Sequence, residues 1–221
     1  MSIREQLDIS AYLVIGPENC SRPVEEVVAS AVGEGFTCVQ IRSKISSARE
    51  MISILKKSAR AIDELGKSDS VALLVDDRLD VVLAARAAGI KVDGVHVGQS
   101  DIPVDVCRKF LGENSIVGLS ASTAEEFSVA DISNIDYFGV GPLHSTATKT
   151  DAGLSLSFEK ISALVKVSPL PIVVGGGVKL KDIPALVKTG VQGFFVVSAV
   201  TNALDERTAA RELVNAWKKF C

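Results

Sequence analysis

Carboxylates at two places in this sequence are the residues best suited to chemistry. Asp76 and Asp77 follow one short apolar run, and Asp101 comes shortly after another. Adjacent carboxylates repel each other unless a cation neutralises them, and Mg²⁺ commonly binds one or two carboxylates together with phosphate oxygens. Asp77 and Asp101 are therefore candidate Mg²⁺ ligands, although the aspartates could instead cap helices expected to begin at Arg78 and Pro103.

Hydrogen-bond donors, most of them cationic, follow other apolar runs. Alternation along an extended chain puts Gln40, Arg42 and Lys44 on one side. Lys149 ends a hydroxyl-rich loop at residues 139–149. Such donors suit the oxygens of a polyanion. A solvated strand end and a flexible surface loop are the alternatives.

A separate phosphate site is expected near three consecutive glycines, Gly175–Gly177. Glycines let backbone amides approach an anion closely. Ser198 follows the last apolar run and leads towards a helix, and helix N-termini also bind phosphate. A tight turn is the alternative. Together, the carboxylates, the cationic donors and the glycines predict a Mg²⁺-dependent enzyme that joins or cleaves phosphorylated small molecules. No Ser–His or Cys–His pair that would indicate covalent catalysis stands out.

Two further polar residues lie at the ends of apolar runs. His96 is expected to be a hydrogen-bonded interior histidine rather than a ligand or base. Of Ser120 and Ser122, one is expected to cap the next helix, and the other could meet a ligand.

The elements that must position these residues alternate along the chain. Short β-branched runs recur roughly every 20–35 residues, the length of a βα unit, and amphipathic stretches lie between them. The expected strands are Ala11–Ile15, Cys38–Arg42, Ala72–Val75, Gly94–Val97, Ile116–Leu119, Tyr137–Val140, Ile172–Val174 and Gly193–Val197. The expected helices are Pro23–Gly33, Ser46–Leu65, Leu79–Ala88, Pro103–Leu111, Thr123–Ala130, Ser157–Val167, Leu180–Lys188 and Glu206–Phe220.

Eight such units predict an α/β fold, a (β/α)8 TIM barrel, forming a single catalytic domain over residues 1–221. An open doubly wound sheet is the alternative. It is disfavoured because no GxGxxG follows the first strand and no GxxxxGK[ST] occurs anywhere. In a barrel, the loops after the strands build one site at one end.

Composition excludes several classes of partner. The 221 residues include 24 Lys+Arg and 27 Asp+Glu, a net charge of −3, and only 5% aromatic residues, which argues against nucleic-acid and anionic-membrane binding. No apolar run reaches the roughly 18 residues needed to span a bilayer, and the first residues do not resemble a signal peptide. The four cysteines form no CxxC, so reduced thiols and a cytoplasmic location are expected. A homo-oligomer is possible.

Taken together, these motifs resemble the thiamine-phosphate synthase family from about Tyr12 to Ala199. The segments that carry the resemblance are Gln40/Arg42/Lys44, Asp76-Asp77-Arg78, Gly94–Asp101, Gly118/Ser120, Gly141–Lys149, Gly176-Gly177 and Val197-Ser198. The family is a (β/α)8 barrel. It joins hydroxymethylpyrimidine diphosphate to thiazole phosphate and releases diphosphate and thiamine phosphate by a dissociative route.

The resemblance also implies roles for individual residues. Those implied to hold the pyrimidine diphosphate are Gln40, Ile41, Arg42, Ser43, Lys44, Asp76, Ser120 and Lys149, of which Arg42, Lys44, Ser120 and Lys149 would act in catalysis. Asp77 and Asp101 would ligate Mg²⁺. Those implied to hold the thiazole phosphate are Thr146, Ala147, Thr148, Gly176 or Gly177, Val197 and Ser198.

One position departs from the family, which usually has Asn where this chain has Asp76. A carboxylate repels an oxyanion where an amide can donate to it, so Asp76 could enlarge the metal site or pair with Arg78 or Lys149. Two rival functions stay open: a thiazole-phosphate tautomerase, with His144 placed to be its base, and a non-catalytic phosphate-binding regulatory protein.

Overall fold

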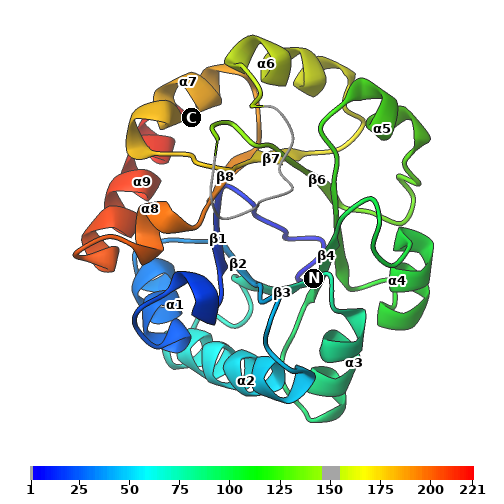
Figure 1. Cartoon of the computed structure of the whole chain (residues 1–221), viewed down its shortest axis with the longest axis vertical. Helices are drawn as coiled ribbons and strands as arrows, with labels where there is room; N and C mark the ends of the chain where they lie inside the picture. The colour runs from blue at the N-terminus through cyan, green and yellow to red at the C-terminus, as the bar shows by residue number, and fades with distance from the viewer. Residues whose placement is uncertain (1, 146–154) are drawn as a thin grey trace.

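A closed barrel of parallel strands forms the centre of the protein. The computed structural model describes residues 2–145 and 155–221. Neighbouring strands pair in sequence order from β1 to β8, and β8 pairs with β1, as Figure 1 shows. The strands are β1 (Ala11–Ile15), β2 (Cys38–Ile41), β3 (Ala72–Asp76), β4 (Gly94–Val97), β5 (Ile116–Ser120), β6 (Tyr137–Val140), β7 (Ile172–Val174) and β8 (Gly193–Val196). The prediction of a (β/α)8 barrel is confirmed, and the open sheet is wrong.

Helices surround the barrel (Figure 1). They are α1 (Val24–Gly33), α2 (Ala48–Glu64), α3 (Leu79–Ala87), α4 (Val104–Leu111), α5 (Ala124–Val129), α6 (Phe158–Val167), α7 (Ile183–Lys188), α8 (Ser198–Thr201) and α9 (Glu206–Phe220), with short 3-10 turns η1 (Pro17–Asn19) and η2 (Leu180–Asp182). No helix in residues 2–145 and 155–221 is long and apolar enough to cross a membrane.

Helix boundaries follow local capping chemistry. The Ser47 side chain accepts a hydrogen bond from the Glu50 N–H at the start of α2, and Thr123 does the same with Glu126 at α5. The predicted helices began at Ser46 and Thr123, which is two residues too early for α2 and one residue too early for α5. The predicted helix Leu180–Lys188 is divided into η2 and α7, because Pro184 lacks the N–H that would bond to Leu180 in a continuous α-helix.

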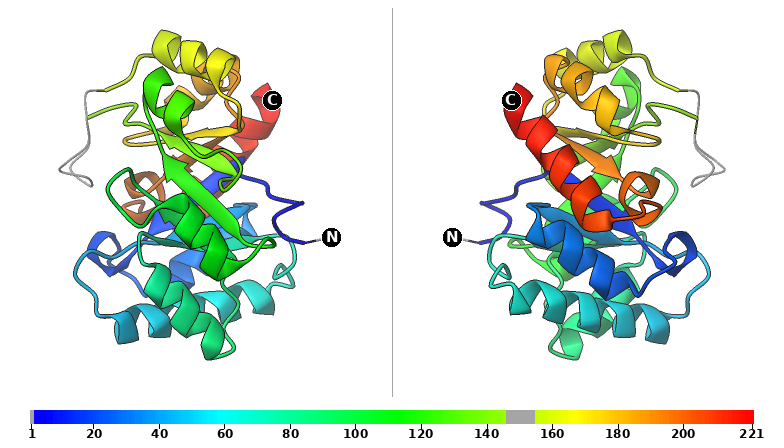
Figure 2. Two further views of the ribbon diagram at one scale, coloured as in Figure 1. Left: turned by 90° about the vertical axis from the view of Figure 1, so that its right-hand side faces the viewer. Right: turned by 90° about the vertical axis from the view of Figure 1, so that its left-hand side faces the viewer.

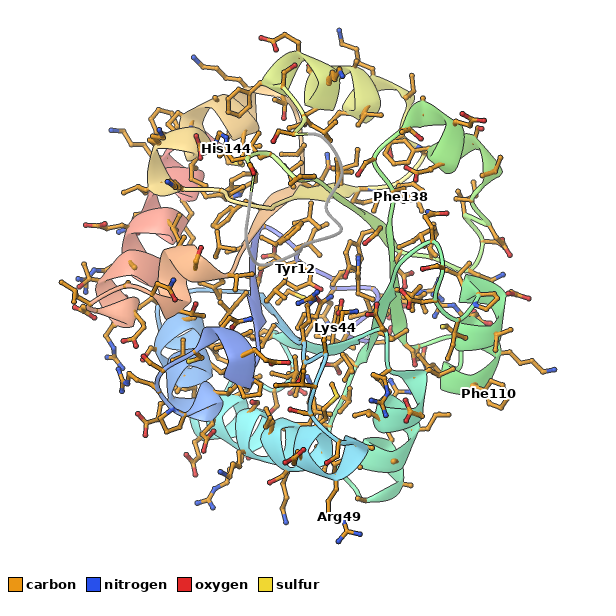
Figure 3. All side chains as sticks on the ribbon, in the orientation of Figure 1. Tyr12, Lys44, Arg49, Phe110, Phe138 and His144 are labelled. Carbon is orange, nitrogen blue, oxygen red and sulfur yellow. The ribbon has the colours of Figure 1, made fainter. Side chains whose placement is uncertain are left out.

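The strands are buried on both faces, as a parallel barrel requires. Outward-facing residues such as Leu13, Val39 and Leu73 pack against the helices. Inward-facing residues such as Tyr12 and Tyr137 form a second, smaller cluster inside the barrel. Figure 3 shows Tyr12 within the ring of strands.

The parallel arrangement brings all the carboxyl ends of the strands to one end of the barrel. The register places Asp76 beside His96 and Ser120 beside Gly139. Strands β3 and β5 extend one residue further than predicted, so Asp76 and Ser120 are the last residues of strands rather than loop residues. The first residues of the chain cross the other end of the barrel (Figure 2). There the Arg4 Nε donates a hydrogen bond to Asp136.

Candidate active site

Three carboxylates gather where β3 and β4 end. Asp77 follows β3 directly and has a φ of 59°, in the left-handed region that Asp tolerates better than most residues. Its N–H donates to the His96 carbonyl at 2.8 Å, which ties the end of β3 to β4. In the loop after β4, the Asp101 Oδ2 accepts a hydrogen bond from the Gly98 N–H at 2.8 Å.

The capping alternatives for these aspartates are wrong. Helix α3 begins at Leu79 and α4 at Val104, and neither start is capped by a side-chain hydrogen bond. The backbone turns after β3 and β4 therefore hold Asp77 and Asp101 at the end of the barrel, where they do not serve helix ends.

Two cations from the end of β2 neutralise this cluster. The Arg42 Nε lies 3.1 Å from the Asp76 Oδ2, and the Lys44 Nζ lies 3.8 Å from the same oxygen. Lys44 also donates a short hydrogen bond to Asp77. Figure 3 shows Lys44 near the centre of the ring of strands in that view. The predicted convergence of Arg42 and Lys44 with the carboxylates is thus present in the structure.

Asp76 pairs with Arg42 and Lys44. Pairing with Arg78 is wrong, because the Arg78 guanidinium binds the neighbouring Asp80 instead. The partner was not predicted because Arg42 and Asp76 are far apart in the sequence. They become neighbours only through the register of β2 and β3.

Burial and charge give the three carboxyl groups different proton affinities. Burial and the Asp77 charge raise the pKa of Asp76 to about 7, against the opposing charges of Arg42 and Lys44. Burial also acts to raise the pKa of Asp77, but hydrogen bonds from Lys44 and Asp101 outweigh it, and the net pKa is lowered. Burial raises the pKa of Asp101, and its hydrogen bond with Asp77 adds to the shift.

The Asp77 and Asp101 carboxylates suit a hard divalent cation that takes its remaining ligands from water or phosphate oxygens. The Asp77 and Asp101 carboxyl groups interact closely enough to shift each other's pKa, downwards for Asp77 and upwards for Asp101. A cation that prefers oxygen ligands could bind to both carboxylates. The described part of the chain holds no group of three His, Cys, Asp or Glu side chains arranged as a complete metal site. A two-carboxylate Mg²⁺ site completed by phosphate oxygens is compatible with this arrangement.

Glu18, which no sequence motif indicated, organises the segment that carries Lys44. Its Oε1 accepts hydrogen bonds from the Ser43 hydroxyl at 2.6 Å and from the Lys44 N–H at 2.8 Å. The N–H of Ile45 also donates to it, at 3.3 Å. Nothing in the local sequence around Glu18 signals this role, since its partners come from a segment that is distant along the chain.

Other predicted residues near β2 are more deeply buried than expected. Gln40 is 4% exposed, and its Nε2 donates to the Tyr12 hydroxyl at 3.0 Å inside the barrel. The Ile41 side chain belongs to the core between barrel and helices. The Ser43 hydroxyl is bound to Glu18. Contacts of these three residues with a pyrimidine diphosphate stay predictions.

Ser120 ends β5 next to the buried His96. The His96 Nε2 and the Ser120 Oγ are 2.9 Å apart, and the Gln99 side chain donates to the Ser120 carbonyl at 2.7 Å. The expectation of a hydrogen-bonded interior histidine is confirmed for His96. The Ser122 hydroxyl donates to the Gly141 carbonyl, and Thr123, rather than either serine, caps α5.

The glycine-rich turn after β7 has the backbone that glycine allows. Gly176 and Gly177 have φ values of 78° and 76°, and a Cβ on them would lie 2.6 Å from a Pro142 carbon and 2.9 Å from a His144 carbon. Val197 and Ser198 follow β8, and α8 begins at Ser198. Both halves of the predicted phosphate site thus lie at the carboxyl ends of adjacent strands.

Some predicted residues lie outside the described residues: Thr146, Ala147, Thr148 and Lys149. His144 is described, and its Nε2 lies 3.0 Å from the Asp182 Oδ2. Asp182 also accepts a hydrogen bond from the Lys179 N–H at 2.9 Å, so this histidine is tied to the start of η2.

Comparison with known proteins decides the family. The family described as thiamine monophosphate synthase matches this sequence over residues 11–200. The chain belongs to that family. Curated relatives named thiamine-phosphate synthase include one from Moorella thermoacetica, 38% identical over 87% of both chains. Another, from Ruminiclostridium cellulolyticum, is 36% identical over 97% of this chain and 98% of the relative.

Solved structures agree with this membership. A thiamine phosphate pyrophosphorylase from Pyrococcus furiosus superposes with a TM-score of 0.83 at 31% identity, covering 99% of this chain and 98% of that one. A 3-hexulose-6-phosphate synthase superposes with a TM-score of 0.68 at 16% identity, a likeness that shows the fold alone. The tautomerase and regulatory alternatives find no support among these relatives.

Proposed function

We propose that this member of the family is itself a thiamine-phosphate synthase. It would join hydroxymethylpyrimidine diphosphate to thiazole phosphate and release diphosphate and thiamine phosphate. The observation that carries the proposal is the cluster of Arg42 and Lys44 with Asp76, Asp77 and Asp101 at the carboxyl ends of β2 to β4. Cations and a carboxylate pair at one place suit a substrate whose leaving group is a diphosphate.

The leaving diphosphate is where this cluster would act. Negative charge accumulates on its oxygens as the bond to the pyrimidine breaks. Arg42 and Lys44 would stabilise that charge, because cationic donors held in place act on the transition state without reorganising. Asp77 and Asp101 would hold Mg²⁺, which when bound neutralises further charge on the diphosphate. The Ser120 hydroxyl, at the end of the neighbouring β5, would donate to the same group.

The thiazole phosphate would bind on the other side of the barrel end. The amides of the Gly176–Gly177 turn and the start of α8 at Ser198 lie at the ends of the adjacent strands β7 and β8. Thr146, Ala147, Thr148 and Lys149 are proposed to complete the two sites. With the two substrates on opposite sides of the barrel end, the thiazole nitrogen would face the carbon that the diphosphate leaves. Holding the substrates in this arrangement would account for much of the rate acceleration.

The reaction is assigned to the cytosol. Cys20, Cys38, Cys107 and Cys221 are all free thiols, which a reducing compartment maintains.

The test is a direct assay of the two phosphorylated halves with the full-length protein. Thiamine phosphate and diphosphate should appear together with added Mg²⁺ and should fall sharply with a chelator. Failure to form thiamine phosphate from the two halves at any Mg²⁺ concentration would refute the proposed function.

Two variants test the assignment of the metal site. Asp101→Asn should abolish most Mg²⁺-supported turnover. Asp105→Asn, an exposed carboxylate four residues later on α4, is the matched control and should behave like the unmodified protein. If both variants turn over normally, Asp101 is not a metal ligand, although the activity itself would stand.

A further inference from the structure

A continuous chain of buried hydrogen bonds crosses the inside of the barrel. The Tyr12 and Tyr137 hydroxyl oxygens are 2.9 Å apart, and the Tyr137 hydroxyl is 2.9 Å from the His96 Nδ1. The chain begins at the Gln40 Nε2, 3.0 Å from the Tyr12 hydroxyl, and ends at Ser120, 2.9 Å from the His96 Nε2. Its members come from β1, β2, β4, β5 and β6.

This chain occupies space that the backbone leaves open for it. A Cβ on Gly118 would lie 2.4 Å from both the His96 Nδ1 and the Tyr137 hydroxyl oxygen, and a Cβ on Gly139 would lie 2.7 Å from the His96 Cε1. Tyr12 and Tyr137 are 2% and 0% exposed. They are the two tyrosines of the chain. An apolar interior needs no hydroxyl groups here, so these buried polar groups point to a role beyond packing.

Gln40 favours one direction for this chain. An amide nitrogen can only donate, so Tyr12 accepts from Gln40, and the Tyr137 hydroxyl oxygen, 2.9 Å away, is placed to take the Tyr12 proton. Tyr137 would then donate to the His96 Nδ1. A neutral imidazole that accepts at Nδ1 carries its proton on Nε2, and that proton would go to the Ser120 oxygen.

We propose that Tyr12, Tyr137 and His96 are positioning residues that make the Ser120 hydroxyl a donor towards the barrel end. With its oxygen accepting from His96, the Ser120 proton is free to point at an anionic group of the substrate. The reverse polarity would turn that proton inward and present only lone pairs, which repel a diphosphate. The consequence for catalysis rests on the proposed function, whereas the polarity of the chain does not.

The polarity can be measured without any substrate. The protein has two histidines, His96 and His144, so ¹⁵N-histidine labelling gives two sets of ring signals, and His144→Gln identifies which set is which. The ¹⁵N shifts and the two-bond couplings to the ring protons should show His96 as neutral with its proton on Nε2. A proton on Nδ1, or on both nitrogens, would overturn the proposal.

The catalytic consequence is measured with Tyr137→Phe, which removes the donor to His96. A misdirected Ser120 proton would no longer stabilise the anionic group of the substrate, so we expect kcat/KM to fall by about 10- to 100-fold. The fall should come mainly from kcat, and the ¹⁵N signature of His96 should change in the same variant. Ser120→Ala should lose a similar factor, and the double variant should lose little more than either single variant.

Ser58→Ala is the matched control for removing a buried hydroxyl. The Ser58 Oγ on α2 has no hydrogen-bond partner among the described residues, so this variant should leave kcat/KM and the His96 signature unchanged. Fully additive losses in Tyr137→Phe and Ser120→Ala would show that the chain does not act through Ser120. If Tyr137→Phe does not fold, the ¹⁵N measurement on the unmodified protein still decides the polarity.

Discussion

The pKa of Asp76 is shifted more strongly than the pKa of the other carboxyl groups in the site, by effects that oppose one another. Burial and the Asp77 charge favour its protonated form, whereas Arg42 and Lys44 favour the carboxylate, and the balance raises its pKa to about 7. Near neutral pH the group is therefore divided between two charge states. A protonated Asp76 resembles the asparagine usual in the family, because it can donate a hydrogen bond to an oxyanion.

This pKa predicts how stability depends on pH. Because the pKa of Asp76 is raised on folding from 3.8 to about 7, its contribution to stability is complete below about pH 4 and is lost as the pH rises to about 7. The upper limit of that loss is about 4 kcal/mol. The pKa of Asp77 is lowered, so its contribution to stability is complete above about pH 4 and is lost as the pH falls further. Asp101, with a raised pKa, adds a slope of the same sign as Asp76.

Asp76→Asn should flatten this dependence. The free energy of unfolding, measured by urea titration in chelator at several values between pH 5 and 7.5, should fall with pH in the unmodified protein and vary less in the variant. Asp80→Asn, which changes the exposed partner of Arg78, is the control. An unchanged slope in Asp76→Asn would mean that another group takes up the proton. The variant should also keep most of its turnover, since it restores the family's usual residue.

At the scale of residues, the sequence predicts well which side chains gather in the site, and poorly which of them form ion pairs with each other. The order of Asp76, Asp77 and Asp101 after successive strands was sufficient to predict that they share a site with Arg42 and Lys44. Which cation faces which carboxylate depends on the register of β2 and β3 and on the backbone turn at Asp77. Neither is encoded in local spacing.

At the scale of elements, the connection between β2 and α2 depends on a turn that precedes α1. Glu18 in η1 accepts hydrogen bonds from Ser43, Lys44 and Ile45. These bonds lower the pKa of Glu18, although burial opposes them. The carboxylate therefore anchors the segment that presents Lys44 to Asp77.

Removing this anchor should affect both binding and folding. In Glu18→Ala the segment of residues 43–45 loses a charged acceptor worth about 1.5–3 kcal/mol, and Lys44 is held less firmly. We expect the KM for the pyrimidine diphosphate to rise by about 10- to 100-fold and the melting temperature to fall by about 3–12 °C. Steady-state kinetics and thermal unfolding measure the two effects.

Glu25→Ala is the control for this experiment, since Glu25 forms an ion pair with Lys57 on the outer helices. It should leave the KM unchanged. A Glu18→Ala variant with normal KM would show that the β2–α2 connection keeps its shape without the carboxylate.

The sequence predicted the strands and helices themselves closely, because each apolar period is a local property. The errors fall where chemistry at helix ends decides the boundary, as with Ser47 and Thr123, or where Pro184 divides a helix. The turn η1 and the short helix α8 were not among the predicted helices, since elements of three or four residues have no apolar period of their own.

At the scale of the whole molecule, the two ends of the barrel carry different kinds of polar residue. The end described above gathers groups suited to a substrate. The opposite end gathers a structural ion network around Asp136, just before β6. Asp136 accepts hydrogen bonds from the Arg108 guanidinium at 2.9 Å, from the Arg4 Nε at 2.7 Å and from the Val117 N–H at 2.7 Å.

Such a network was not predicted, because its residues show no motif. Arg108 is 4% exposed on α4, and Arg4 comes from the segment that crosses the amino ends of the strands (Figure 2). In this barrel class, polar residues at the amino end serve stability rather than catalysis. Arg4, Arg108 and Asp136 come together only when the barrel closes.

Substitutions at the amino end of the barrel should therefore lower stability without changing activity. Asp136→Ala leaves the buried Arg108 without its carboxylate, and an uncompensated buried charge destabilises by about 3–5 kcal/mol. For a chain of this size that corresponds to a fall in melting temperature of about 6–20 °C. Glu64→Ala, which removes an exposed ion pair with Arg60 on α2, should lower stability by about 1 kcal/mol or less. Well below the melting temperature, kcat and KM of Asp136→Ala should match those of the unmodified protein. A loss of kcat without a loss of stability would show that the amino end of the barrel communicates with the site, and the division between the two ends would then be wrong.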